Sequence, residues 1–499
     1  MTANGPGETS HAEVHTTLKN ALKLGGSLVL TLVIGFGVRI ALRRFLGPTV
    51  IGPVNFADAF ATTGFVFLGL GLDTYIRKVV PVRLERASDF VGTFLALRAA
   101  MSLVIFAVMA GVLEWMGQPP EVRVLVWAYG AAQLFLSLNQ TFTALLQSAR
   151  TIDGLSVLNV VSKLLWAAGF VATMAFRWPL VGIPLSVAAA EALKAAVGFR
   201  LARKHLGLTL RVDWAQVRPV LRASFAFYVN AVALVVVNRF DVNVLKVRAD
   251  DTEIGLYSAA SELAQMTFVM TPMLGGVVAP LFARTLAKGR DEYGQVLRRT
   301  LELVLAFAFP ASLAILVGAD FWVRILLGPQ YAASAWALAI LGPTFLLTYV
   351  AVVVATALNL SGGEWTVTVT SLVSLVLNPV LVLALVALSR GWGVGGGGAA
   401  CAMAAIVTET VVLVAMLWRM GRVVIDARLV RMVVKTTLAC VAVVAVDRFA
   451  LQGLGYARLL VDAGLYAALV LASGALSVRE TVGFVKSLRA QRAAMAAGS

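Results

Sequence analysis

Long uninterrupted apolar runs recur along almost the whole chain of 499 residues. About fourteen of them reach the roughly 20 residues that a helix needs to cross a hydrocarbon layer. They are expected to be helices, because a backbone in lipid must satisfy its own hydrogen bonds and barrel strands would be far shorter. The predicted spans are 18–46, 52–79, 90–113, 122–148, 155–177, 179–203, 219–248, 253–283, 298–319, 331–360, 365–389, 396–418, 431–450 and 456–478. The sequence therefore predicts an all-α, multi-pass membrane protein.

The composition excludes several other classes of protein. Hydrophobic residues make up 60% of the chain and charged residues 14%, whereas soluble proteins have about 45–50% and about 25%. The polar stretches between spans are too short to bury a core of their own. Cys401 and Cys440 fall inside predicted spans, so neither a disulfide nor a metal site is expected. No cofactor is expected either.

The basic residues lie in short loops between the spans and predict an orientation. The net charge is +16. The side that carries both termini has about 27 Lys and Arg residues and the other side about 10, so the positive-inside rule places both termini in the cytoplasm. The basic clusters on this side are Arg77–Arg86, Arg200–Arg222, Arg284–Arg299 and Arg419–Lys435. Such loops attract anionic lipids, and nucleic-acid binding is not expected. The first span is expected to be an uncleaved signal-anchor.

The second half of the chain repeats a pattern of the first half. The segment from Ile51 (IGPVNFADAFATTGFVF) and the segment from Ile254 (IGLYSAASELAQMTFVM) share six residues at a constant offset. Six spans separate them, which predicts two lobes related by an axis along the membrane normal, as in parallel-repeat transporters. The expected parts are a cytoplasmic tail 1–17, an N-lobe 18–204, a linker 205–218, a C-lobe 219–419, two extra spans 431–478 and a basic cytoplasmic tail 479–499.

Several of these segments resemble a known family of transporters. RRFLGPTVIGPVNFADAF followed by LGLDTYIRKVVP resembles the start of bacterial polysaccharide-unit flippases of the Wzx type. RFDVNVLKVRADDTEIGLYSAASEL resembles the start of the second half of such proteins, and LNPVLVLALVALSRGWGVGGGGAACAMAA their eleventh and twelfth spans. The resemblance implies two six-helix lobes that form a V around a central cavity, with alternating access. It also implies movement of an undecaprenyl-diphosphate-linked oligosaccharide from the inner to the outer leaflet of the bacterial cytoplasmic membrane.

Charged residues within the predicted spans are the candidate functional residues, because each one needs a partner or a wet cavity. Helical rise places Arg39 and Asp58 about 10 Å below the outer surface, and Arg239 and Glu262 about 12–13 Å below it. This predicts the pairs Arg39–Asp58 and Arg239–Glu262, which either hold helices together or have a gating or substrate role.

The cations and the acids have different predicted roles. A diphosphate needs fixed positive charge, so the candidate substrate-binding cations are Arg39, Arg98, Lys163 and Arg239. Snorkelling to the surface is the alternative for Arg98 and Lys163. The candidates for gating, or for coupling to Na⁺ or H⁺, are Asp58, Asp241, Glu262 and Glu409, for which a structural ion pair is the alternative.

Three functions compete. An oligosaccharide flippase is favoured over a cation-coupled multidrug antiporter, because the first span carries Arg39 and no acid. The resemblance also includes lipid II flippases, which the sequence does not separate from flippases for O-antigen, capsule or exopolysaccharide units. A membrane glycosyltransferase or polymerase is disfavoured because no nucleophile–base or metal constellation appears. The expected class is therefore a transporter and not an enzyme, with a polysaccharide polymerase as a potential partner.

Overall fold

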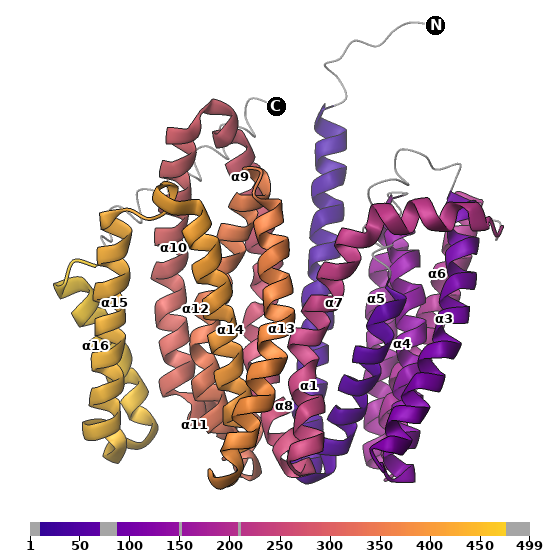
Figure 1. The fold of residues 1–499 in the computed structure, drawn as a ribbon, viewed down its shortest axis with the longest axis horizontal. Helices are drawn as coiled ribbons and strands as arrows, with labels where there is room; N and C mark the ends of the chain where they lie inside the picture. The colour runs from indigo at the N-terminus through magenta and orange to yellow at the C-terminus, as the bar shows by residue number, and fades with distance from the viewer. Residues whose placement is uncertain (1–9, 70–86, 149–151, 208–210, 476–499) are drawn as a thin grey trace, which may run out of the picture. The chain divides into compact units, whose positions relative to one another are not determined.

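The computed structural model describes residues 10–69, 87–148, 152–207 and 211–475 of the chain. Within these ranges the chain forms helices joined by short turns, and none of the described residues forms a strand (Figure 1). The residues group into two compact units, Met1–Val247 and Arg248–Ser499. The cluster Arg77–Arg86, the end of the predicted span 52–79 and the tail 479–499 lie outside the described residues.

The described part of the first unit contains six long helices and two short 3₁₀ turns. Its elements are α1 (Ser10–Phe65), η1 (Val66–Leu68), α3 (Ala87–Trp115), α4 (Pro120–Ser148), α5 (Ile152–Ala175), α6 (Gly182–Leu206), η3 (Trp214–Gln216) and α7 (Val217–Arg248), which ends at the border of the unit. α1 contains a sharp kink at Gly47, whose φ of 77° is left-handed. Glycine tolerates this conformation, and the following Pro48 removes a backbone donor. The predicted boundary between spans 18–46 and 52–79 is this kink.

Small residues let the helices of the first unit approach closely. A Cβ at Gly169 on α5 would lie 2.7 Å from the Cβ of Ser186 on α6. A Cβ at Gly182 would lie 2.6 Å from Oγ1 of Thr173. Close approach through small residues is the usual way in which helices associate in lipid, where no hydrophobic force acts between them.

The second unit is built around α12. Its elements are α8 (Asp251–Met266), η4 (Thr267–Met270), α9 (Thr271–Lys288), α10 (Arg290–Val317), α11 (Ala319–Leu326), η5 (Pro329–Tyr331), α12 (Ser334–Leu360), α13 (Glu364–Leu388), η6 (Ser389–Gly391), α14 (Gly396–Met420), η7 (Gly421–Val423), α15 (Ala427–Val446), the π-helical turn η8 (Asp447–Leu451), η9 (Gln452–Ala457) and α16 (Arg458–Ala472). α12 packs against α8, α9, α10, α13 and α14. Its buried face includes Tyr349 and Val353.

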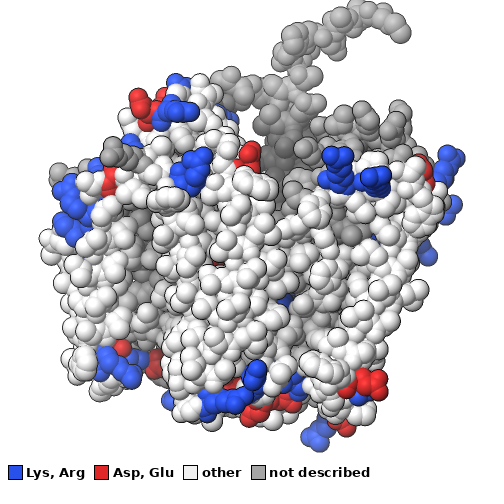
Figure 2. Space-filling view, viewed as in Figure 1, with Lys and Arg blue, Asp and Glu red and all other residues white. Residues whose placement is uncertain are grey.

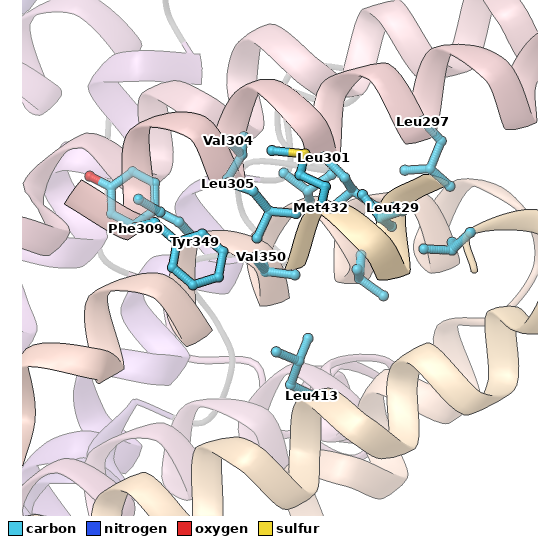
Figure 3. Close-up of a cluster of buried hydrophobic side chains, with 14 of the residues drawn as sticks. Leu297, Leu301, Val304, Leu305, Phe309, Tyr349, Val350, Leu413, Leu429 and Met432 are labelled. Atoms are coloured by element: carbon cyan, nitrogen blue, oxygen red, sulfur yellow. The ribbon is translucent and has the colours of Figure 1, made fainter. Parts of the chain in front are cut away.

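One continuous hydrophobic core runs through the second unit from α9 to α16. In Figure 3, Leu305 of α10 lies near Tyr349 and Val350 of α12, and Met432 of α15 lies near Leu301 of α10. The same core includes side chains of α16, among them Tyr466 and Val470. The last two helices are therefore packed into the unit and are not a loosely attached addition.

The turn before α14 is stabilised by an acidic side chain from α8. Gly393 and Gly395 have left-handed φ values of 81° and 90°. Both carboxylate oxygens of Glu253 accept backbone hydrogen bonds, one from Gly395 and the other from Gly398 at 3.2 Å. A carboxylate at this place satisfies orphan donors and opposes the positive end of the helix dipole. These bonds hold the glycine-rich turn before α14 against α8.

Charged side chains gather at the two ends of the helices in each unit, with a broad uncharged band between them (Figure 2). Among the described residues, nine helical stretches are long and apolar enough to cross a membrane. The stretch Ala427–Ala472 includes the predicted span 431–450 and most of the predicted span 456–478. The protein is an all-helical, multi-pass membrane protein, although these nine stretches do not confirm the predicted count of fourteen.

The two repeated segments adopt matching conformations. Ile51 and Ile254 are both fully buried, as are Ala57 and Ala260. In each segment the α-helix passes into a 3₁₀ turn about four helical turns after this isoleucine. This turn is η1 in the first unit and η4 in the second. These common features support the internal repeat.

Candidate functional site

Three positions spaced four residues apart follow one face of α1. Arg39 and Arg43 lie one and two helical turns beyond Gly35, so the three positions span about 12 Å. Gly35 is buried, Arg39 is exposed and Arg43 is buried. The spacing of four residues, which the sequence shows, places them on one face.

Lys163 from α5 lies close to this face of α1 at Gly35. Its ammonium lies 4.0 Å from the ring centre of Trp166 on the same helix. A Cβ at Gly35 would lie 3.1 Å from Cε and 3.5 Å from Nζ of Lys163. Glycine at position 35 therefore leaves room for the half-buried lysine, and the aromatic ring holds its ammonium group. A cation over an indole ring is favourable by about 0.5–2 kcal/mol, depending on its exposure.

Farther along α1, Asp58 forms an ion pair with Arg239 of α7. One Nη1–Oδ2 distance is 3.4 Å, and the two side chains are 32% and 35% exposed, respectively. The pair joins the second part of α1 to α7. Asp58, Arg39, Arg239 and Arg43 all lie within electrostatic range of the buried Tyr129 hydroxyl on α4. Tyr129 is thus a member of the site that the sequence did not single out.

Amide side chains connect the same helices beside the ion pair. Asn243 Nδ2 of α7 donates to Oγ1 of Thr63 on α1 at 3.1 Å. Gln133 Nε2 of α4 donates to Oγ1 of Thr62 at 2.7 Å. These bonds fix α1, α4 and α7 around the Asp58–Arg239 pair.

Arg98 is held by other groups of the protein through all three of its nitrogens. It is 1% exposed. Its Nε donates to the Leu68 carbonyl at 2.9 Å and its Nη2 to the Gly69 carbonyl at 3.2 Å. Its Nη1 donates to the Ser137 carbonyl at 2.7 Å and to Oγ1 of Thr141. This arrangement favours a structural role, in which Arg98 joins the end of η1 to α4, over the substrate-binding role that the sequence suggested.

The predicted acidic candidates lie on different helices. Asp241 of α7 is buried, and its Oδ1 accepts from the backbone N–H of Val242 at 2.8 Å. Glu262 of α8 and Glu409 of α14 are half-buried in the second unit. The pair Arg239–Glu262 would join the two units and stays a prediction, as does the pair Arg39–Asp58. Among the described residues, no group of three or more His, Cys, Asp or Glu side chains is arranged to hold a metal ion.

The first unit thus brings together Lys163, Arg39, Arg43 and Arg239, with Asp58 as an acidic partner. Four cations and one carboxylate give this group an excess of positive charge within the helical bundle. Arginine offers bidentate geometry for phosphate oxygens, and lysine offers a compact point charge. The arrangement is therefore suited to bind a polyanion, and we call these five residues the cation stripe.

The sequence of residues 17–286 matches the model of a family described as "Polysaccharide biosynthesis protein". No curated protein sequence matches the chain. Among solved structures, "Lipid II flippase MurJ, inward closed conformation" is similar with a TM-score of 0.67 and 11% identity, over 92% of this chain and 99% of that one.

Two solved MATE transporters are also similar. An inward-facing "multidrug resistance MATE family transporter of the MOP superfamily" has a TM-score of 0.59 and 11% identity, over 77% of this chain and 98% of that one. A mutant of the Vibrio cholerae MATE transporter VcmN has a TM-score of 0.56 and 14% identity, over 82% of this chain and 98% of that one. At these identities the similarity shows the fold, which this chain shares with these solved transporters.

Proposed function

This chain belongs to the polysaccharide biosynthesis protein family, and we propose that it is a flippase for a lipid-linked oligosaccharide. In this proposal an undecaprenyl-diphosphate-linked repeat unit moves from the inner to the outer leaflet of the bacterial cytoplasmic membrane by alternating access. The unit then serves the synthesis of an O-antigen, a capsule or an exopolysaccharide. The proposal depends on the cation stripe of the first unit.

The cation stripe has the charge that a diphosphate needs. Placing charged groups inside a membrane costs on the order of 2.5–3.5 kcal/mol each on translocon scales. Four of its five side chains are cationic, and Arg and Lys are the side chains that bind phosphate oxygens. Arg39 is exposed, and Lys163 and Arg239 are half-buried, so these three side chains can reach a ligand without unfolding the bundle.

Two related functions have weaker support. A cation-coupled multidrug antiporter has the same fold, but the positive excess of the stripe opposes a cationic drug. A lipid II flippase is favoured by the similarity to MurJ, and the stripe would suit a lipid-linked diphosphate of either kind. The substrates of these two candidates differ in their sugar portion, so a comparison of transport of the two substrates must separate them. Na⁺ or H⁺ as the coupling ion and a polysaccharide polymerase as a partner belong to the same proposal.

Reconstitution tests the proposal directly. The purified protein is placed in vesicles that carry a labelled undecaprenyl-diphosphate-linked oligosaccharide in both leaflets, and an enzyme outside the vesicles trims the exposed sugar. We expect the inner-leaflet pool to become accessible only when the protein is present. Vesicles with lipid II and vesicles loaded with the cationic dye ethidium are the comparisons. Movement of lipid II or ethidium without movement of the oligosaccharide would contradict the proposal.

The proposed orientation has its own test. By the positive-inside rule, the excess of Lys and Arg on one side predicts that both termini are cytoplasmic. Alkaline phosphatase, which is active only outside the cytoplasm, is therefore expected to stay inactive when fused after Ser499, while green fluorescent protein fused there should fluoresce. An active phosphatase fusion would show that the orientation or the number of crossings is different.

A further inference from the structure

A buried acidic pair lies where α15 meets α16 in the second unit. The buried face of α16 is formed by Arg458, Asp462, Tyr466 and Val470, at intervals of one helical turn. Asp447 lies opposite, at the start of the π-helical turn η8, and is also buried. π-Helical turns are rare and are frequent at functional sites.

Arg458 donates hydrogen bonds to two carboxylates, those of Asp447 and Asp320. Its Nη1 donates to both oxygens of Asp447, at 2.8 and 2.9 Å. Its Nη2 donates to Oδ1 of Asp320 on α11 at 2.7 Å. Gln452 Nε2 also donates to Asp447 Oδ2, at 3.3 Å. Asp447 is therefore well stabilised as an anion.

Asp462 has none of these stabilising contacts. It is 4% exposed, and both of its oxygens are buried without a hydrogen-bond donor among the described residues. The Asp447 carboxylate lies nearby, bound to Arg458, which is one helical turn before Asp462 on the same buried face of α16. Two ionised carboxylates at such a distance repel each other, and a buried carboxylate without donors is strongly disfavoured. A proton on Asp462 removes both costs, because the carboxyl group can then donate to Asp447.

We propose that Asp447 and Asp462 form a buried proton-binding site that holds one proton, carried by Asp462 and donated to Asp447. The proton comes from water and returns to it. Because Arg458 fixes the charge on Asp447, the second carboxyl group is the one that is neutral. Asp320 is 51% exposed and contacts the same arginine, so the site lies next to the surface from which the proton enters. In the predicted orientation this is the outer surface of the membrane.

The groups around the site are compatible with a single proton. The other titratable groups near the site come from neighbouring elements: Asp320 from α11, Asp447 and the exposed Arg448 from η8, and the exposed Tyr456 from η9. Cys440 of α15 lies near Tyr466 of α16. α10 contributes the Val317 carbonyl, which lies 3.5 Å from Arg458 Nη2. Among the described residues, Arg458 is the buried cation of this group, and it is shared by Asp447 and Asp320. A second ionised buried carboxylate would therefore have to share a cation whose hydrogen bonds go to two other carboxylates.

Infrared spectroscopy of the purified protein tests the proposal. The difference between the spectra of the unmodified protein and Asp462→Asn should contain the C=O stretch of one protonated carboxyl group, which shifts in deuterated water. Asp320→Asn, which removes an acid from the same arginine, should not remove this band. Loss of a carboxylate band in Asp462→Asn would overturn the proposal. A band that is present in choline buffer and absent in sodium buffer would also overturn it, because Na⁺ would then be the ligand.

The pH dependence of unfolding is a second measurement. The folded protein holds a proton that the unfolded chain releases above the ordinary titration range of Asp, so stability falls as pH rises. Between the ordinary titration range of Asp and the pH at which the folded site releases its proton, the unfolding equilibrium constant in detergent should gain up to about one additional tenfold factor per pH unit relative to Asp462→Asn. Equal pH dependence in the two proteins would show that Asp462 is not protonated in the folded state.

Discussion

Replacement of Arg98 by Lys is expected to lower the amount of folded protein as severely as replacement by Gln. The guanidinium donates from three nitrogens to the Leu68, Gly69 and Ser137 carbonyls and to Thr141. One ammonium group cannot span acceptors on η1 and α4 at once. Each lost hydrogen bond to a charged group contributes about 1.5–3 kcal/mol, so a loss of about 3 kcal/mol or more is expected. Thermal unfolding in detergent and the yield in membranes measure it.

Arg200→Gln is the control for Arg98. Arg200 is exposed at the end of α6, and substitutions at such sites usually change stability by less than about 0.5 kcal/mol. If Arg98→Lys folds and exports normally, while Arg98→Gln folds but fails to export, then Arg98 contributes charge to the substrate. That result would contradict the structural role and favour the role that the sequence suggested.

The course of the helices could be predicted from the sequence because lipid imposes simple rules. Apolar runs of about 20 residues must be helical, and the predicted span 396–418 corresponds to α14, Gly396–Met420. The predicted boundary between spans 18–46 and 52–79 falls at the kink in α1, where Gly47 and Pro48 have backbone preferences that need no tertiary information. The repeated segments at Ile51 and Ile254 indicated an internal repeat, and both segments share the change from α-helix to 3₁₀ turn.

The partners of the charged residues could be predicted only in part. Helical rise gives the depth of a side chain and not the direction in which its helix is turned. Depth alone matched Asp58 with Arg39, and it did not indicate that Asp58 lies 3.4 Å from Arg239. The main acceptors of Arg98 are backbone carbonyls, which every sequence contains and which carry no signal.

The acidic pair of the second unit was missed, although the sequence held a signal for it. Asp447 and Asp462 lie within the predicted spans 431–450 and 456–478, and Arg458 lies near the start of the second of them. By the same reckoning of helical rise, these three residues lie about 3–9 Å inside the outer ends of their spans. Their contact depends on the π-helical turn η8, which no local sequence preference predicts.

Loss of the positive charge at Arg239 or Lys163 is expected to reduce export of the oligosaccharide much more than loss of the acid at Asp58. If the cation stripe binds the diphosphate, each cation contributes a charge-assisted hydrogen bond of about 1.5–3 kcal/mol. Arg239→Gln and Lys163→Gln should therefore lower the rate of transport in vesicles by on the order of tenfold or more, since about 1.4 kcal/mol is a factor of ten. Arg239→Lys and Lys163→Arg should keep most of it.

Asp58→Asn separates this explanation from a purely structural one. The Asp58–Arg239 pair is about one-third exposed on both sides, and ion pairs of this kind contribute about 0–1 kcal/mol. Its removal releases Arg239 for the substrate, so Asp58→Asn should fold and transport at close to the normal rate. If Asp58→Asn loses transport as fully as Arg239→Gln, and the double variant Asp58→Arg with Arg239→Asp restores it, the pair is structural. The positive charge of the stripe would then have to act on the diphosphate through Lys163 and Arg39.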